Sequence, residues 1–465
     1  MINDREPKRS LLSCLPSVHV MQRQPRIQDL LSRYDHRRLD AIIRKVLNDA
    51  RARIRHPNYV LEKASIKIED LTDKVVANLD IEDHRLDKVL INASGILFHP
   101  GASNWNAGTT ARRASELALR LAPFPKTDRI SRLLCELTGA EDALVTHSIP
   151  AAFLLAVQSY ASGKEVIINR NQLGLIDAPY NDGPADPVSI CKLAGSKLVE
   201  VGATNKTGVS DYRSVIRDQT ALVAYIRPST YALRGFTAES GLEEILEAGV
   251  ATNTTVLYLA GDTTLRPLIS AGYRSSCSVS EAVRCGAPLI ISASGGLIGG
   301  PPCGLLFGSR RILAGIRKHG LWPTMQAAWH VRAGLEARLT EMAQGSYDLE
   351  GHPTEGMLTA SKKEIGIRAR ALLDKLSTRK RLRGAFSIVE QPTYLTTYRL
   401  PNDSIASFSV SVRPDGALTE DLASYWACST PSLLVNYDRS QLLIDIRGVG
   451  ENQITTVSET INTYL

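Results

Sequence analysis

The sequence lacks the features that mark membrane, secreted and metal-dependent proteins. No apolar run approaches the roughly eighteen residues that a membrane span needs, and the N-terminus, MINDREPKRSLLSC, is charged where a signal peptide is apolar. The seven cysteines form no CxxC pair, and the nine histidines form no HExxH motif. We therefore predict no disulfide framework and no metal site. We expect a cytoplasmic protein that is not attached to a membrane.

Positive charge is unevenly distributed along the chain. The 465 residues carry a net charge of +7, but residues 1–56 alone hold thirteen Lys/Arg against six Asp/Glu. Residues 57–465 hold 42 of each sign. The net excess therefore belongs to the first segment, whereas 43% hydrophobic residues over this length are ordinary for a globular protein with a large core.

The first segment is predicted to be helical with a basic outer face. Apolar residues recur at helical spacing over residues 15–55, with an interruption near Tyr34 and Asp35. Clustered cations of this kind neutralise nucleic-acid phosphates. The alternative is an ordinary solvated helix surface. The residues of the basic face are Arg33, Arg37, Arg38, Arg44, Lys45, Arg51, Arg53 and Arg55.

The middle of the chain has the pattern of an α/β domain. Short apolar strands such as EVIINR, ALVAYIR, TVLYLAG and PLIISAS alternate with amphipathic helices, which predicts a mainly parallel sheet covered on both faces. We expect a basic helical domain over 1–60, a linker over 61–87 and the large α/β domain over 88–310. Residues 311–465 are expected to form a long helix and a small α+β domain.

Several segments form a recognisable series in order along almost the whole chain. They include INASG (91–95), LLCELTGAEDALV (133–145), GKEVIINRNQL (163–173), KLVEVGATNKTG (197–208) and RGFT (234–237). These segments resemble bacterial selenocysteine synthase, the L-seryl-tRNA(Sec) selenium transferase family. The resemblance implies a pyridoxal-phosphate (PLP) transferase fold of type I for the large domain. It also implies an N-terminal domain that engages tRNA and a homo-oligomer built from dimers.

The turn SASGGLIGGPPCG departs from the family at the position that carries its chemistry. The corresponding family segment reads SGDKLLGGP, and its lysine holds PLP as a Schiff base. Aligned on GGP, that lysine position holds Gly296, and no lysine occurs between Lys206 and Lys318. The family's VMEDLGSG is VLYLAGDT here, which places Leu259 where the resemblance implies the carboxylate partner of the ring nitrogen. Asp262, three residues on, is expected to face the other side of a strand.

Other positions of the implied cofactor and substrate sites are also changed. The phosphate-binding segment at a helix N-terminus is replaced by THSIPAA, so Thr146, His147 and Ser148 are vestigial cofactor residues that could bind an anion or simply cap the helix. The family's RGSRYSH-like segment becomes PFPKTDR, in which Lys126 alone keeps a basic residue at one of the two matching arginines.

Three functional hypotheses remain from the sequence. We prefer a non-catalytic family member that uses no cofactor and retains RNA binding or a regulatory role. The second is an active transferase or lyase whose cleft binds an anionic ligand through Lys126, Lys206, Arg227 or Arg234. The third is a true selenium transferase, which would require PLP catalysis without the family's lysine.

Overall fold

The structure, a computed structural model, divides the chain into two compact units. The first comprises Met1–Leu90 with Ser424–Ser432, and the second Ile91–Ala423 with Leu433–Leu465. None of the helices formed by the described residues is long and apolar enough to cross a membrane. The described residues are 12, 14–55, 67–83, 90–99, 109–120, 129–176, 185–270, 273–274, 277–344, 353–377, 384–400, 403–414 and 419–464.

The N-terminal unit is helical and has its own hydrophobic core. Its helices are α2 (Val18–Gln22), α3 (Pro25–Leu31), α4 (His36–Arg55) and α5 (Ile68–Asp83). Leu39, Ile43 and Leu47 of α4 are fully buried and share one cluster with Leu71 and Val75 of α5. The segment expected to be a linker over 61–87 therefore contains a helix that completes the core of this unit.

The second unit is built on a seven-stranded sheet with the order β2-β12-β11-β8-β6-β3-β4. Strands β11, β8, β6, β3 and β4 are parallel, and β12 lies antiparallel between β11 and β2. The strands are β2 (Asp142–Thr146), β3 (Glu165–Asn169), β4 (Lys197–Val201), β6 (Thr220–Ile226), β8 (Thr255–Gly261), β11 (Leu289–Ala293) and β12 (Gly304–Gly308).

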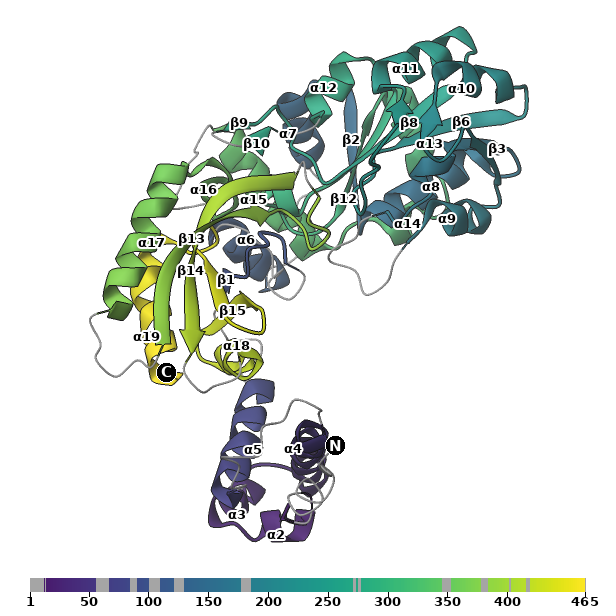
Figure 1. Cartoon of the computed structure of the whole chain (residues 1–465). Helices are drawn as coiled ribbons and strands as arrows, with labels where there is room; N and C mark the ends of the chain where they lie inside the picture. The colour runs from purple at the N-terminus through teal and green to yellow at the C-terminus, as the bar shows by residue number, and fades with distance from the viewer. Residues whose placement is uncertain are drawn as a thin grey trace, which may run out of the picture. The chain divides into compact units, whose positions relative to one another are not determined.

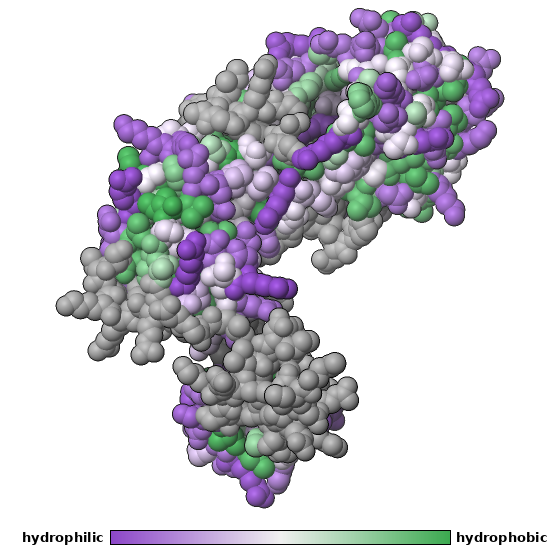
Figure 2. All heavy atoms as spheres, viewed as in Figure 1, coloured by the Kyte–Doolittle hydropathy of each residue, from purple (hydrophilic) through white to green (hydrophobic). Residues whose placement is uncertain are grey.

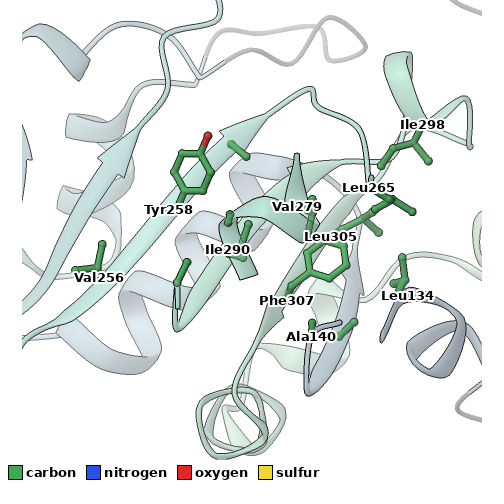
Figure 3. Packing of buried hydrophobic residues seen from close by; sticks show 14 of the residues in the cluster. Leu134, Ala140, Val256, Tyr258, Leu265, Val279, Ile290, Ile298, Leu305 and Phe307 are labelled. Atoms are coloured by element: carbon green, nitrogen blue, oxygen red, sulfur yellow. The ribbon is translucent and has the colours of Figure 1, made fainter. Parts of the chain in front are cut away.

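Helices cover both faces of this sheet, as the alternation of strands and helices predicts (Figure 1). One core packs under α8 (Ile149–Ala161), α9 (Pro187–Leu193) and α13 (Arg310–Lys318), with α14 (Trp322–Met325) beside it. The opposite core, shown in Figure 3, packs under α7 (Arg129–Thr138), α10 (Val209–Val215), α11 (Leu242–Ala251), α12 (Val279–Arg284) and α15 (Trp329–Ala343). Alternate residues of each strand enter opposite cores.

A smaller five-stranded sheet lies in the C-terminal half, in the order β1-β15-β16-β14-β13. Its first strand, β1, lies within the range 88–310 that we expected to form the large domain, but it contributes to the small sheet. The strands are β1 (Leu90–Ala93), β13 (Gly384–Tyr394), β14 (Ser404–Pro414), β15 (Ser432–Tyr437) and β16 (Leu442–Asp445).

The stretch expected to be one long helix after residue 310 is instead a series of separate helices, from α13 to α17. Among them, α15 packs on α6 (Thr109–Arg120), while α17 (Lys362–Ser377) packs on β13, β14 and α19 (Ile454–Tyr464). The remaining elements are α16 (Pro353–Thr359), α18 (Thr419–Cys428), the two-residue strands β5 (Lys206–Thr207), β7 (Ala238–Glu239), β9 (Ile269–Ser270) and β10 (Tyr273–Arg274), and the 3-10 turns η3 (Arg170–Gln172), η4 (Gly296–Ile298) and η6 (Glu451–Gln453).

Candidate functional site

Some of the residues singled out from the sequence, Leu259, Asp262 and Gly296, come from segments that meet at the carboxyl ends of the parallel strands. Strands β8 and β11 are neighbours, and both end beside the glycine turn that leads into β12. Open α/β sheets bind ligands at this edge. The turn is anchored by Ile298 of η4, which packs in the same core as Leu265 and Leu134 (Figure 3).

Gly296 is buried and has a backbone conformation that suits glycine. Its φ is +55°, in the left-handed region, and a Cβ built on it would lie 2.1 Å from Oδ2 of Asp262. That distance is far below van der Waals contact. The carboxylate of Asp262 therefore fills the volume in which a side chain at position 296 would begin.

Asp262 is held against the turn by a hydrogen bond from the backbone. The N–H of Leu297 donates to Oδ1 of Asp262 at 3.0 Å. Strand β8 ends at Gly261, whose φ is +67°, so the period of two on which our expectation for Asp262 rested does not extend to it. The sequence showed an acidic residue nearby but could not show that the chain turns it toward Gly296.

Leu259 occupies a fully apolar position. Its side chain is 1% exposed and packs in the core under α8, with Leu257 and Ile291 in the same cluster. It pairs with Ile226 on one side and Ile291 on the other. A carboxylate at this position would require a charge in an apolar core, so the site offers the ring of a cofactor no acidic partner at residue 259.

At the N-terminus of α8, polar groups are mostly used within the protein. Ser148 caps the helix by accepting from the N–H of Ala151 at 3.2 Å, and its carbonyl accepts from Ala152. The hydroxyl of Thr146 is buried and donates to carbonyls of Ser148 and Gly304. Pro150 has no N–H to donate. Only the exposed side chain of His147 extends outward, so capping accounts for this segment.

Of the three proposed anion ligands that the structure describes, Arg227 alone donates side-chain hydrogen bonds to the end of β8. Arg227 is half-buried at this edge of the sheet, and its Nη1 donates to the carbonyls of Ala260 and Asp262, at 3.4 and 3.2 Å. Lys206 and Arg234 are exposed. Lys126 lies outside the described residues. The structure therefore brings Arg227 to Asp262, where it stabilises the end of β8.

A polar cluster that the sequence did not reveal lies at the end of β3. Glu239 is exposed as a residue, but partial desolvation of its carboxyl raises the pKa, and this carboxyl accepts hydrogen bonds from Gln172 and Asn169. The carbonyl oxygen of the Gln172 side chain accepts from the N–H of Ile226 at 2.9 Å, and Thr207 donates to Asn169 at 2.9 Å. These bonds tie β7 and β5 to the sheet. The segment INRNQL contains the amides but gives no indication of their acidic partner.

In the N-terminal unit, the expected basic face is on the surface. The side chains of Arg33, Arg37, Arg38, Arg44, Lys45 and Arg51 are exposed, and the guanidinium of Arg38 lies 5.3 Å from the ring centroid of Tyr34. Arg53 and Arg55 lie on α4, but their side chains are outside the described part of the structure. The apolar residues of α4 face the core, so the basic residues form the outer side of the helix.

Comparison with known proteins gives one consistent family. The profile described as L-seryl-tRNA selenium transferase (SelA) matches residues 107–450, more than half of the chain. Curated L-seryl-tRNA(Sec) selenium transferases are similar over nearly the full length. That of Carboxydothermus hydrogenoformans is 27% identical over 98% of each chain, and that of Moorella thermoacetica is 29% identical over 94% of each chain.

A solved structure confirms the predicted fold class. D-glucosaminate-6-phosphate ammonia-lyase superimposes with a TM-score of 0.58 at 17% identity, covering 82% of this chain and 96% of that one. The large domain therefore has the PLP-transferase fold of type I.

The family contradicts our expectation that no cofactor is involved, because L-seryl-tRNA selenium transferases are PLP-dependent. The residues described above nevertheless do not fit a PLP held in the family's manner. Position 296 has no amine and no room for one beside Asp262, and Leu259 is apolar. The hydroxyl groups of Thr146 and Ser148 are also used within the protein, whereas the fold that surrounds these positions is retained.

Proposed function

We propose, from the premise that the chain belongs to the L-seryl-tRNA selenium transferase family, that it does not convert seryl-tRNA and instead acts as an RNA-binding partner protein. In this proposal the N-terminal helical unit binds tRNA in the cytoplasm, and the chain assembles from dimers. The proposal is that the chain does not convert seryl-tRNA, and it makes no statement on whether the chain binds PLP.

The observation that carries the proposal is the pair formed by Gly296 and Asp262. A Schiff base needs a primary amine whose chain reaches the cofactor aldehyde. Here the residue has no side chain, and the adjacent volume contains a carboxylate. Electron withdrawal also needs an acid at the ring nitrogen, and Leu259 supplies none. Two independent requirements of the family's chemistry fail at neighbouring positions.

RNA binding is supported by the charge and architecture of the N-terminal unit. The exposed Arg and Lys residues lie on the outer side of α4, and the unit has a separate core made by α2 to α5. Residues 1–56 carry the +7 excess in the sequence, and the side chains of Arg37, Arg38, Arg44 and Lys45 are exposed, so these four can contact phosphates.

Catalysis is tested by incubating the purified chain with PLP, seryl-tRNA(Sec) and a selenium donor, with the Moorella thermoacetica relative as positive control. We expect no selenocysteinyl-tRNA from this chain under conditions in which the control reacts to completion. Turnover, together with borohydride trapping of PLP on one lysine, would show that another amine performs the chemistry.

RNA binding is tested in the full chain by substituting Arg37, Arg38, Arg44 and Lys45 with Ala. Fluorescence anisotropy with labelled tRNA across a salt series should show weaker binding and a slope of log K against log salt reduced by about 2.8 to 3.6 for four contacts. A matched control replaces four exposed basic residues of the large domain, Lys164, Lys192, Arg213 and Arg284. Equal effects of the two variants would contradict the assignment to α4.

A further inference from the structure

The balance of charge over residues 57–465 hides a second basic segment. Residues 362–383, KKEIGIRARALLDKLSTRKRLR, contain nine Lys/Arg against two Asp/Glu. This excess of +7 equals the net charge of the whole chain and is offset by acidic residues elsewhere. Its first part forms α17, on the small sheet, far in sequence from the N-terminal unit.

Helix α17 leaves one face open beside β14. Ile365, Ala369, Leu372 and Leu376 are buried toward the sheet and α19. The next face lines a groove of about 770 Å³. At the left of Figure 2, over the α17 region of Figure 1, apolar atoms are bordered by hydrophilic ones. The residues that line the groove are Lys362, Lys363, Gly366, Ile367, Arg370, Ala371, Asp374 and Phe408.

The floor of the groove is apolar and its rim is cationic. Ile367 is 60% exposed, which is unusual for an isoleucine on a packed helix. Gly366 leaves the ring of Phe408 accessible, since a Cβ there would approach its Cε2 to 3.3 Å. Lys362 lies 5.5 Å from the centroid of that ring and forms an ion pair with Glu390.

The ion pair with Glu390 neutralises Lys362, so Lys363 and Arg370 supply the remaining positive charge of the rim. Both side chains are exposed, and they are two helical turns, or about 10 Å, apart. Asp374 is the acidic residue of the lining. A cationic rim beside an aromatic and aliphatic floor suits a phosphate backbone whose bases or riboses pack against apolar surface.

We propose that the groove between α17 and β14 is a second RNA-binding surface of this protein. Lys363 and Arg370 contact phosphates, and Ile367 and Phe408 pack against the nucleotide units between them. The proposal extends the RNA-binding function proposed above to a site on the second unit. It adds a contact that the N-terminal charge alone does not provide.

The test uses the full chain and labelled tRNA, with Lys363→Ala/Arg370→Ala as the variant. Two lost phosphate contacts should lower the slope of log K against log salt by about 1.4 to 1.8. If the electrostatic contribution vanishes near 1 M salt, this corresponds to roughly 30-fold weaker binding at 0.1 M. The variant Lys363→Arg/Arg370→Lys, which keeps both charges, should retain the slope.

The matched control is Lys164→Ala/Lys192→Ala, which removes two exposed charges from the large domain. Equal slopes for this control and the Lys363→Ala/Arg370→Ala variant overturn the proposal. The proposal is also overturned if the Lys363→Ala/Arg370→Ala variant loses binding to phosphatidylglycerol vesicles while its tRNA binding is unchanged. If only the α17 variant weakens tRNA binding, the groove is supported and the N-terminal assignment fails. If only the α4 variant does, the groove is excluded. A full chain that binds no tRNA contradicts both.

Discussion

The carboxylate of Asp262 occupies the volume that a side chain at position 296 would need. The effects of substitutions at the two positions on stability should therefore be coupled. We expect Gly296→Ala to lower the free energy of unfolding by about 1–3 kcal/mol, because the left-handed backbone and the overlap with Asp262 both add strain. Asp262→Ala should remove the overlap, since it deletes the Cγ and both oxygens that would lie within 3 Å of that Cβ. The double variant should therefore lose less than the sum of the single ones. Urea unfolding of the four proteins measures the coupling.

Gly163→Ala separates backbone strain from collision. Gly163 also has a positive φ, +72°, but a Cβ there meets no atom within 4 Å. We therefore expect Gly163→Ala to lower the free energy of unfolding by less than Gly296→Ala does. Equal losses at the two positions would show that Asp262 moves aside freely.

Restoring the family's lysine tests the same pair in functional terms. Gly296→Lys alone should not give an efficient PLP enzyme, since the amine meets Asp262 and Leu259 offers the ring nitrogen no acid. The informative variant combines Gly296→Lys, Leu259→Asp and Asp262→Ala. We expect an aldimine absorbance band that borohydride fixes onto residue 296 in this triple variant only. Seryl-tRNA conversion by the single variant would contradict this account.

Asp445 should make stability depend on pH. Burial raises the pKa of its carboxyl from 3.8 to about 6, although Thr393, Ser407 and the N–H of Arg447 donate to it. The folded protein therefore holds a proton that the unfolded chain releases, and this contribution to stability falls as pH rises between these values. Relative to Asp445→Asn, the free energy of unfolding of the wild type should fall by at most about 3 kcal/mol as the pH rises from 3.8 to about 6.

Urea unfolding at about pH 4.5 and pH 7 measures the effect. Asp438→Asn provides the contrast, since hydrogen bonds from Ser440 lower the pKa of Asp438 to about 2. A lowered pKa gives stability that is present at both of these pH values and lost only in stronger acid. A difference between wild type and Asp445→Asn that stays constant with pH would show that Asp445 remains ionised.

At the scale of elements, α5 determines where the N-terminal unit can be cut. Deleting residues 1–56 removes α4 and should expose Leu71, Val75 and Leu79 of α5 to water. We expect that truncated chain to bind a hydrophobic dye and to aggregate, whereas deletion of residues 1–83 should do neither. Dye fluorescence and size-exclusion chromatography compare them. Identical behaviour would mean that α5 does not depend on α4.

The elements also show what the sequence could predict. Strands such as EVIIN and LIISA are short, apolar and regularly spaced, so the α/β class and the two-sided sheet follow from the pattern. The helix over residues 68–83 is harder to predict, because its apolar periodicity is weak and its stability depends on packing against α4. The substitution of Gly296 is visible in the sequence, but the carboxylate that fills its place depends on how β8 ends at Gly261.

At the scale of the whole molecule, the two positive segments should contribute separately to RNA affinity. The α4 and α17 surfaces belong to different compact units and share no side chains, so their contributions to the salt slope should add. A chain carrying both sets of substitutions should lose about 4.2 to 5.4 from the slope, against about 2.8 to 3.6 for the α4 set alone.

We expect the N-terminal unit to provide the larger share, since it offers more exposed cations than the groove. The chain lacking residues 1–83 should therefore retain a weak, salt-sensitive affinity for tRNA, and Lys363→Ala/Arg370→Ala in that chain should abolish most of it. Anisotropy titrations at several salt concentrations measure each slope, with thermal unfolding as the check that every variant is folded. Full-length affinity in the truncated chain would contradict the assignment to α4, because residues 1–83 would then contribute no phosphate contacts.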